Sequence, residues 1–85
     1  MSTLDLAFKQ AEADVRLLDA MPDNATLLKL YGLFKQATEG DVAGDPPELF
    51  DVRGTAKFKA WKALAGMPKD VAKRNYVALV AALRG

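Results

Sequence analysis

Apolar residues recur at steps of three and four along most of this chain, which is the spacing of one face of an α-helix. In residues 4–18 the apolar positions are Leu4, Phe8, Ala11, Val15 and Leu18, and charged side chains lie between them. This segment predicts a first amphipathic helix. Its apolar face needs a partner, because a short amphipathic helix is marginal in water by itself.

A second helix is predicted over residues 25–39, after a turn at residues 21–24. Asp23 or Asn24 can cap this helix, because either side chain accepts hydrogen bonds from the backbone amides of the first turn. Gly40 can end it, because glycine adopts a positive φ with little penalty. The helix carries a core-facing row of Leu27, Leu30, Phe34 and Ala37 beside a second row of Leu28, Tyr31, Lys35 and Thr38. The two rows predict two surfaces with different uses.

Residues 41–54 contain two glycines and two consecutive prolines, which predicts a loop. Its apolar residues Val42, Leu49 and Phe50 are expected to pin it to the helices, so that it is a packed connection. The acidic residues of the loop lack the alternating spacing of a helix-loop-helix calcium site, and no metal is expected there.

Two further helices are predicted after the loop. The third covers residues 55–65 and places Lys57, Trp61 and Leu64 on one side, with Trp61 expected in the core. The fourth carries Pro68 in its first turn, where the missing N–H of proline is no loss. Its apolar positions are Ala72, Tyr76, Leu79, Val80 and Leu83.

The helical spacing of the apolar residues and the capping, glycine and proline residues between the segments together predict an all-α fold. We expect a four-helix bundle that forms one domain over residues 1–85. No β-type alternation and no internal repeat interrupts the helical pattern. The long loop between the second and third helices argues against a simple up-down-up-down topology.

Composition narrows the possible functions. The chain has no histidine and no cysteine, so the usual general base, metal ligand and nucleophile are absent and an enzyme is not expected. The lack of cysteine fits a reducing cytoplasm. The first residues show no basic leader, and no run of 18 apolar residues occurs, so neither secretion nor stable membrane insertion is expected.

The charges are unevenly distributed along the chain. Residues 1–51 contain four basic and ten acidic side chains, whereas residues 52–85 contain eight basic and one acidic side chain. This asymmetry is consistent with a local anion site, with nucleic-acid binding or with attraction between the two halves of the fold. A nucleic-acid partner is disfavoured, because the cations are spread around two helices without a helix-turn-helix pattern.

One segment points to a ligand. Tyr31 and Lys35 are four residues apart and Phe34 is adjacent, so an apolar surface, a phenol and an ammonium group are expected to share one patch that suits an amphipathic anion. The sequence LYGLFKQATEGD at residues 30–41 resembles the second helix of the acyl-CoA-binding protein family. GTAKFKAW at residues 54–61 resembles the third helix of that family. The similarity extends from about Phe8 to Tyr76.

The resemblance implies a four-helix bundle in which a crossover loop makes the second and third helices parallel. It also implies a non-enzymatic, monomeric, cytoplasmic carrier that binds medium- to long-chain acyl-CoA esters in lipid metabolism and needs no cofactor. The ligand-binding residues that it implies are Lys35 and Lys57 for the phosphates, Arg16 as a further cation, Tyr31 and Tyr76 as contacts, and Phe34.

Three positions depart from the family pattern, and one of them is Phe58, which stands where tryptophan is frequent. Phe34 stands where the family usually has a tyrosine, so the ring is kept and the hydroxyl is lost. Glu12 stands where a small residue is usual. An alternative function also remains open, that of a small helical protein-interaction module whose apolar row accepts a partner helix.

Overall fold

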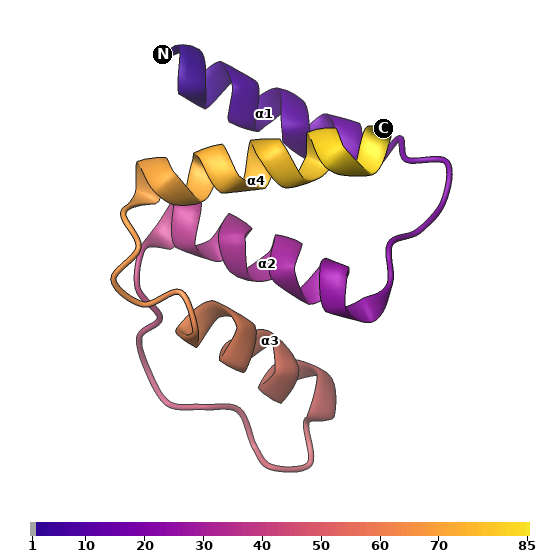
Figure 1. Ribbon diagram of the computed structural model, residues 1–85. Coiled ribbons are helices and arrows are strands. Elements are labelled where there is room, and N and C mark those ends of the chain that lie inside the picture. Colours follow the sequence, from indigo (N-terminus) through magenta and orange to yellow (C-terminus); the bar gives the residue numbers. More distant parts are fainter. Residues whose placement is uncertain (1) are drawn as a thin grey trace.

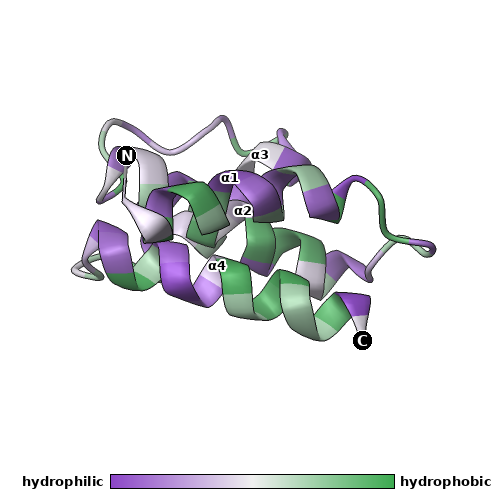
Figure 2. Cartoon of the chain, turned by 90° about the horizontal axis from the view of Figure 1, so that it is seen from above, coloured by the Kyte–Doolittle hydropathy of each residue, from purple (hydrophilic) through white to green (hydrophobic). Residues whose placement is uncertain are grey.

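The computed structural model describes residues 2–85, and these residues form four α-helices and no strand. The helices are α1 (Thr3–Val15), α2 (Asn24–Glu39), α3 (Val52–Lys62) and α4 (Lys69–Arg84). The predicted all-α class is therefore confirmed. Hydrophobic and hydrophilic residues alternate along the helices, as their amphipathic sequences require (Figure 2).

Two of the predicted capping residues are confirmed. The Asp23 Oδ1 atom accepts a hydrogen bond of 2.8 Å from the Thr26 amide at the start of α2. Gly40 ends the same helix with a φ of 81°, a value that glycine adopts without the steric cost of a Cβ atom. These local signals are reliable because each satisfies backbone groups that a helix end leaves unpaired.

Several predicted helix ends were wrong by a few residues. The helix α1 stops at Val15 instead of Leu18, because the Leu17 amide bonds back three residues to the Asp14 carbonyl at 2.9 Å and tightens the chain into a turn. The helix α3 begins and ends three residues earlier than predicted. The Asp51 Oδ1 atom caps it by accepting from the Gly54 amide at 2.9 Å. Pro68 immediately precedes α4 and is not part of its first turn.

The helices lie in the spatial order α1, α4, α2, α3 (Figure 1). Among residues 2–85, backbone contacts join α1 with α4, α4 with α2 and α2 with α3, and no other pair of helices. The Cα atoms span 37 × 29 × 15 Å, so the bundle is flattened. As a result α1 and α2 flank α4 instead of packing closely along each other.

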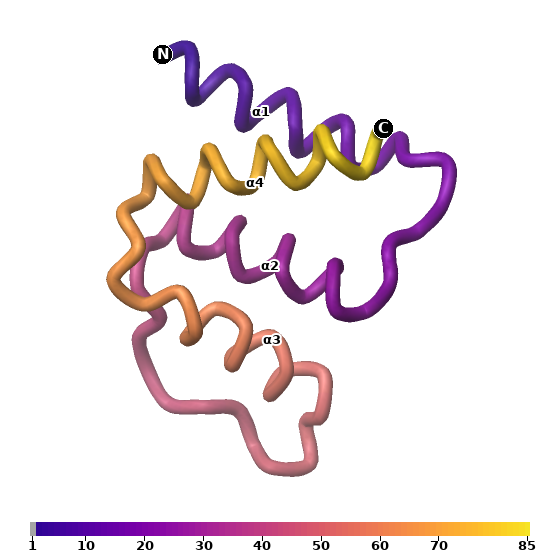
Figure 3. Tube along the Cα trace, viewed as in Figure 1, coloured from indigo at the N-terminus to yellow at the C-terminus, as the bar shows by residue number. Residues whose placement is uncertain are grey.

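The helices α2 and α3 are parallel, as the family resemblance implied. Tyr31 lies beside Lys57 and Lys35 lies beside Trp61, so the positions that meet advance in the same direction along both helices. The chain achieves this because residues 40–51 return past α3 to the end of the molecule where α2 began (Figure 3). The crossover loop is thus required by the parallel packing.

The crossover loop is held by polar contacts at its beginning. The Asp41 Oδ1 atom accepts from the Gly66 amide and from the Gln36 Nε2 atom, both at 2.8 Å, and these bonds lower the pKa of the Asp41 carboxyl below its usual value. The Trp61 Nε1 atom donates to the Gly40 carbonyl at 2.8 Å. These bonds fasten the end of α2 to the end of α3.

The predicted apolar anchoring of the loop was largely wrong. Leu49 and Phe50 are 96% and 84% exposed, and only Val42 is partly buried. Leu49 and Phe50 lie at the end of the loop, directly before α3, whereas the residues that hold the loop are Gly40 and Asp41 at its beginning. The loop depends on hydrogen bonds more than on apolar packing.

Two ion pairs between α1 and α4 show that these helices are also parallel. The Lys73 Nζ atom lies 2.7 Å from Asp5 Oδ1, and the Arg84 guanidinium lies 3.0 Å from Asp14 Oδ2. The hydrogen bond from Lys73 lowers the pKa of the Asp5 carboxyl, and the same bond raises the pKa of Lys73. Both pairs join the acidic N-terminal half to the basic C-terminal half, which is the electrostatic match that the charge asymmetry suggested.

Three aromatic rings join α1, α2 and α4. The Phe8 ring stacks on Phe34 at a centroid distance of 5.9 Å and meets Tyr76 edge to face at 5.1 Å. Phe34 and Tyr76 are 6.2 Å apart. Such offset and edge-on arrangements are favourable beyond the area that they bury. The aromatic cluster of Phe8, Phe34 and Tyr76 therefore sets how α1 and α2 approach each other.

A glycine controls the distance between α2 and α3. A Cβ atom at Gly32 would lie 2.7 Å from the Ala60 carbonyl oxygen, which is inside van der Waals contact and belongs to the backbone. Because a backbone carbonyl in a helix cannot move aside alone, α2 and α3 can approach this closely only when residue 32 lacks a side chain.

We expect Gly32→Ala to destabilise the protein, although alanine is the better residue inside a helix. The clash with α3 costs about 1–3 kcal/mol, whereas the gain in helix propensity is about 1 kcal/mol. Urea unfolding followed by circular dichroism measures the difference. An increase in the unfolding midpoint would show that the two helices separate at no cost.

Candidate functional site

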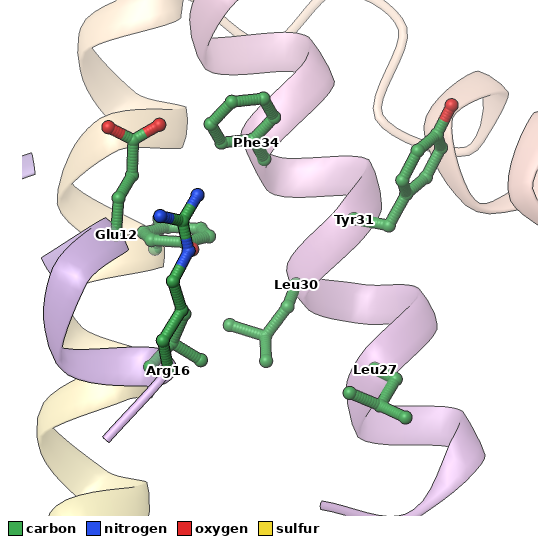
Figure 4. A pocket seen from close by; sticks show the side chains of 8 residues that line it. Glu12, Arg16, Leu27, Leu30, Tyr31 and Phe34 are labelled. Atoms are coloured by element: carbon green, nitrogen blue, oxygen red, sulfur yellow. The ribbon is translucent and has the colours of Figure 1, made fainter. Parts of the chain in front are cut away.

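A surface pocket lies between α1, α2 and α4, beside the aromatic cluster. Its volume is 320 Å³, which is within the usual range for small-molecule sites. Its walls are Glu12, Val15 and Arg16 from the end of α1, Leu27, Leu30, Tyr31 and Phe34 from α2, and Tyr76 from α4 (Figure 4). We call it the α1–α2 pocket.

The α1–α2 pocket exists because α1 and α2 touch through rings and not through their backbones. Phe8 and Phe34 bring the two helices together at one point, and the chain beyond that point carries the shorter side chains Val15 and Leu30. Phe34 is partly buried and Tyr76 is almost wholly buried, so the pocket wall is continuous with the hydrophobic core. A planar apolar group can rest against these rings.

Two opposite charges face the rim of this pocket. Glu12 and Arg16 lie one turn apart at the end of α1, and their side chains extend along the same side (Figure 4). Burial, and secondarily the Glu12 carboxylate, raise the pKa of the Tyr76 phenol above its usual 10.0, while Arg16 acts in the opposite direction. Tyr76 is consequently a neutral phenol at physiological pH.

A second pocket, of 470 Å³, lies between α2 and α3, and we call it the α2–α3 pocket. Its walls are Asn24, Leu27, Leu28 and Tyr31 from α2 and Val52, Arg53, Ala56 and Lys57 from α3. Tyr31 and Leu27 line both pockets. A ligand that crosses α2 at these two residues can therefore occupy an aromatic pocket and an aliphatic pocket at once.

Two lysines rest on aromatic faces at the boundary between α2 and α3. The Lys57 Nζ atom is 5.3 Å from the centre of the Tyr31 ring, and the Lys35 Nζ atom is 4.9 Å from that of Trp61. Lys35 also forms an ion pair with Glu39, one turn further along α2. Both ammonium groups are thus held near the aromatic surface that separates the helices.

The structure distributes the six predicted site residues over two sides of α2. Arg16, Tyr31, Phe34 and Tyr76 line the α1–α2 pocket, and Lys57 lines the α2–α3 pocket. Lys35 lines neither pocket. The expectation that Tyr31, Phe34 and Lys35 share one patch was right for the two rings, which line the same pocket, and wrong for Lys35, which rests on Trp61 of α3.

Several pocket residues were not identified from the sequence, namely Leu27, Leu28, Val52, Arg53 and Ala56. Arg53 precedes Lys57 by four residues, so the two side chains lie on the same face of α3. This spacing could have predicted Arg53 as a neighbour of Lys57, but only if the helix had been expected to begin at Val52. The aliphatic residues gave no such signal, because an apolar residue on a helix is expected in the core unless its partner helix is known.

Residues 2–85 contain no group of three or more metal-ligating side chains placed to hold an ion. In the same part of the chain, no helix is long and apolar enough to cross a bilayer.

Comparison with known proteins gives consistent matches. The model of the family described as acyl CoA binding protein matches residues 5–80. Acyl-CoA-binding protein homolog 1 of Caenorhabditis elegans is 49% identical over 77 residues, which cover 91% of this chain and 90% of that protein. The crystal structure of Oryza sativa acyl-CoA-binding protein 2 superposes with a TM-score of 0.90 at 35% identity and covers 94% of this chain and 89% of that one.

A further relative is much longer. Human enoyl-CoA delta isomerase 2 is 46% identical over 76 residues, which cover 89% of this chain but only 19% of that protein. The matched region therefore also occurs as one part of a larger protein.

The charges around Tyr76 can be tested by titration. In a Tyr31→Phe background Tyr76 is the only tyrosine left, and its ionisation, followed by tyrosinate absorbance, is expected at a pH above 10.0. Adding Glu12→Gln should lower this midpoint and adding Arg16→Gln should raise it. Glu48→Gln on the distant loop is the control. Circular dichroism shows whether each variant is folded. If neither Glu12→Gln nor Arg16→Gln shifts the titration midpoint of Tyr76 in folded protein, the two charges do not lie beside Tyr76 as described.

Proposed function

Because this chain belongs to the acyl-CoA-binding protein family, we propose that it binds and carries medium- to long-chain acyl-CoA esters without catalysing a reaction on them. It would buffer free ester and deliver it to the enzymes of lipid metabolism. Residues 1–85 would act as one acyl-CoA-binding domain, with one ligand per monomer.

The observation that carries this proposal is the meeting of two chemically different pockets at Tyr31. The α2–α3 pocket has the aliphatic walls Leu27, Leu28 and Val52, which suit an acyl tail. The α1–α2 pocket has the rings of Tyr31, Phe34 and Tyr76, which suit a purine base. An acyl-CoA ester contains both kinds of group in one molecule.

Each pocket has a cation in its wall, and a third cation lies nearby on α2; these groups would bind the phosphates of such a ligand. Arg16 lines one pocket and Lys57 the other, and Lys35 lies on α2 one turn beyond Tyr31. Ammonium and guanidinium groups make charge-assisted hydrogen bonds to phosphate oxygens. Lys35 would exchange part of its interaction with Glu39 for such a contact.

The expected energies are adequate for a carrier. Each buried methylene contributes roughly 0.8 kcal/mol, so a tail of about sixteen carbons can supply on the order of 12 kcal/mol before the costs of association. Free coenzyme A lacks this contribution, and a free fatty acid lacks the contacts to the phosphates. Both parts of the ligand are needed for tight binding.

Composition supports the non-enzymatic part of the proposal. The chain has neither histidine nor cysteine, so the common thioester-cleaving dyads are not available. We place the protein in the cytoplasm as a monomer with no nucleic-acid partner, no cofactor and no stable membrane insertion.

The ligand is tested by calorimetry with palmitoyl-CoA, free coenzyme A and palmitate. We expect palmitoyl-CoA to bind far more tightly than either part alone, because only the ester engages both pockets and the cations. Equal affinity for palmitate and palmitoyl-CoA would show that the phosphates do not contribute to binding, and the proposed cation contacts would then be wrong. If palmitoyl-CoA neither binds nor raises the melting temperature, the alternative of a protein-interaction module is favoured.

The cations are tested by single substitutions. Lys35→Ala and Lys57→Ala should each weaken palmitoyl-CoA binding by roughly 1.5–3 kcal/mol while the protein stays folded. Lys35→Ala is expected at the lower end, because Glu39 already occupies the Lys35 ammonium. Added salt should weaken wild-type binding as well.

Lys29→Ala and Lys62→Ala serve as matched controls, because both side chains are exposed and line neither pocket. The assignment of Lys35 and Lys57 is wrong if the control variants lose affinity and the Lys35 and Lys57 variants do not.

A further inference from the structure

The Glu12 carboxylate occupies an unusual place for a site that is proposed to bind phosphates. Glu12 is partly buried and lines the α1–α2 pocket beside Arg16 and Tyr76. It also lines a second hollow, of 410 Å³, whose rim carries Lys9, Lys69 and Lys73. Glu12 therefore forms the wall between the aromatic pocket and a hollow surrounded by lysines.

The Glu12 carboxylate forms no direct ion pair within the described part of the chain. Among residues 2–85, the acidic partners in ion pairs are Asp5, Asp14 and Glu39. Arg16, one turn further along α1, lines the α1–α2 pocket together with Glu12, and the two side chains extend in the same direction (Figure 4). The pocket thus presents a carboxylate and a guanidinium to the same ligand.

We propose that Glu12 limits the affinity of the site for its ligand, because its carboxylate opposes the anionic head group in the α1–α2 pocket and keeps affinity below what the surrounding cations allow. This inference rests on the proposed acyl-CoA binding. Glu12 raises the pKa of the Tyr76 phenol and Arg16 lowers it, so both charges act on a group in the wall of the α1–α2 pocket, which supports the inference.

The effect arises from charge more than from volume. A like charge several ångströms from a phosphate, in partly solvated surroundings, changes affinity by roughly three- to tenfold. Arg16 reduces the repulsion without removing it, and Tyr76 adds no charge as a neutral phenol. Lys9, Lys69 and Lys73 lie on the other side of Glu12, where Asp5 pairs with Lys73. These three lysines therefore line a different hollow from the one that holds the head group in this proposal.

The experiment compares wild type, Glu12→Gln and Glu12→Asp by calorimetry with decanoyl-CoA and hexadecanoyl-CoA. Glutamine keeps the size and removes the charge, so we expect it to tighten binding of both ligands by about the same three- to tenfold factor. Aspartate keeps the charge and should stay within about twofold of wild type. Increasing salt should shrink the difference between Glu12→Gln and wild type.

Glu48→Gln is the matched control, because Glu48 is exposed on the crossover loop and lines none of these pockets. Glu48→Gln removes one negative charge from the protein, as Glu12→Gln does, and it should leave the affinity for both esters unchanged. Glu12→Ala is a second variant that also removes the charge, and melting temperatures confirm that each variant is folded.

Three results with Glu12→Gln would overturn the inference. Unchanged affinity in Glu12→Gln means that the ligand does not sense the carboxylate, and weaker binding means that the carboxylate accepts a hydrogen bond from the ligand. A gain that grows with tail length places Glu12 beside the tail. If wild type binds neither ester, the two proposals separate: binding by Glu12→Gln alone supports the role of Glu12, and no binding by any variant rejects both.

Discussion

The aromatic cluster of Phe8, Phe34 and Tyr76 is the interaction on which the arrangement of α1, α2 and α4 depends. The helices α1 and α2 flank α4 and make no close backbone contact with each other, so their separation is set by ring contacts at 5.1–6.2 Å. The space beyond the rings becomes the α1–α2 pocket. Phe34 and Tyr76 belong to the core and to the pocket wall, so substitutions there affect stability and binding together.

Close packing of α3 on α2 is the second constraint. Gly32 lets the backbones approach, and Lys57 and Lys35 then reach aromatic rings across the interface. The parallel direction of α2 and α3 requires residues 40–51 to return along the molecule. Asp41 and Trp61 fasten the beginning of that return with hydrogen bonds of 2.8 Å. Cations from two distant segments come together through these contacts.

The charges have a structural role as well as a proposed binding role. Asp5 and Asp14 on α1 pair with Lys73 and Arg84 on α4, which joins the acidic and basic halves of the chain. Glu12 lies on the same helix as these acids, but it lines the α1–α2 pocket and forms no ion pair with α4. One amphipathic helix thus supplies both the ion pairs that hold it in place and the charged rim of the candidate site.

The sequence by itself determined the local structure and the family. Helical spacing and the signals at Asp23 and Gly40 predicted four helices, because caps and periodicity act within one or two turns. The motifs at residues 30–41 and 54–61 pointed to the family, to its parallel α2 and α3, and to Tyr31, Phe34 and Lys57 among the residues that line the two pockets.

Only the tertiary structure decided which surfaces are covered and which remain open. Phe34 and Tyr31 are close on α2, yet they point to different neighbours because α4 lies on one side of that helix and α3 on the other. Leu49 and Phe50 are exposed although they are apolar, and Gln36 is fully buried although it is polar, because Asp41 and the Met67 carbonyl accept from its amide. Periodicity shows which face of a helix is apolar. Whether that face becomes core, pocket or surface depends on long-range contacts that no local pattern encodes.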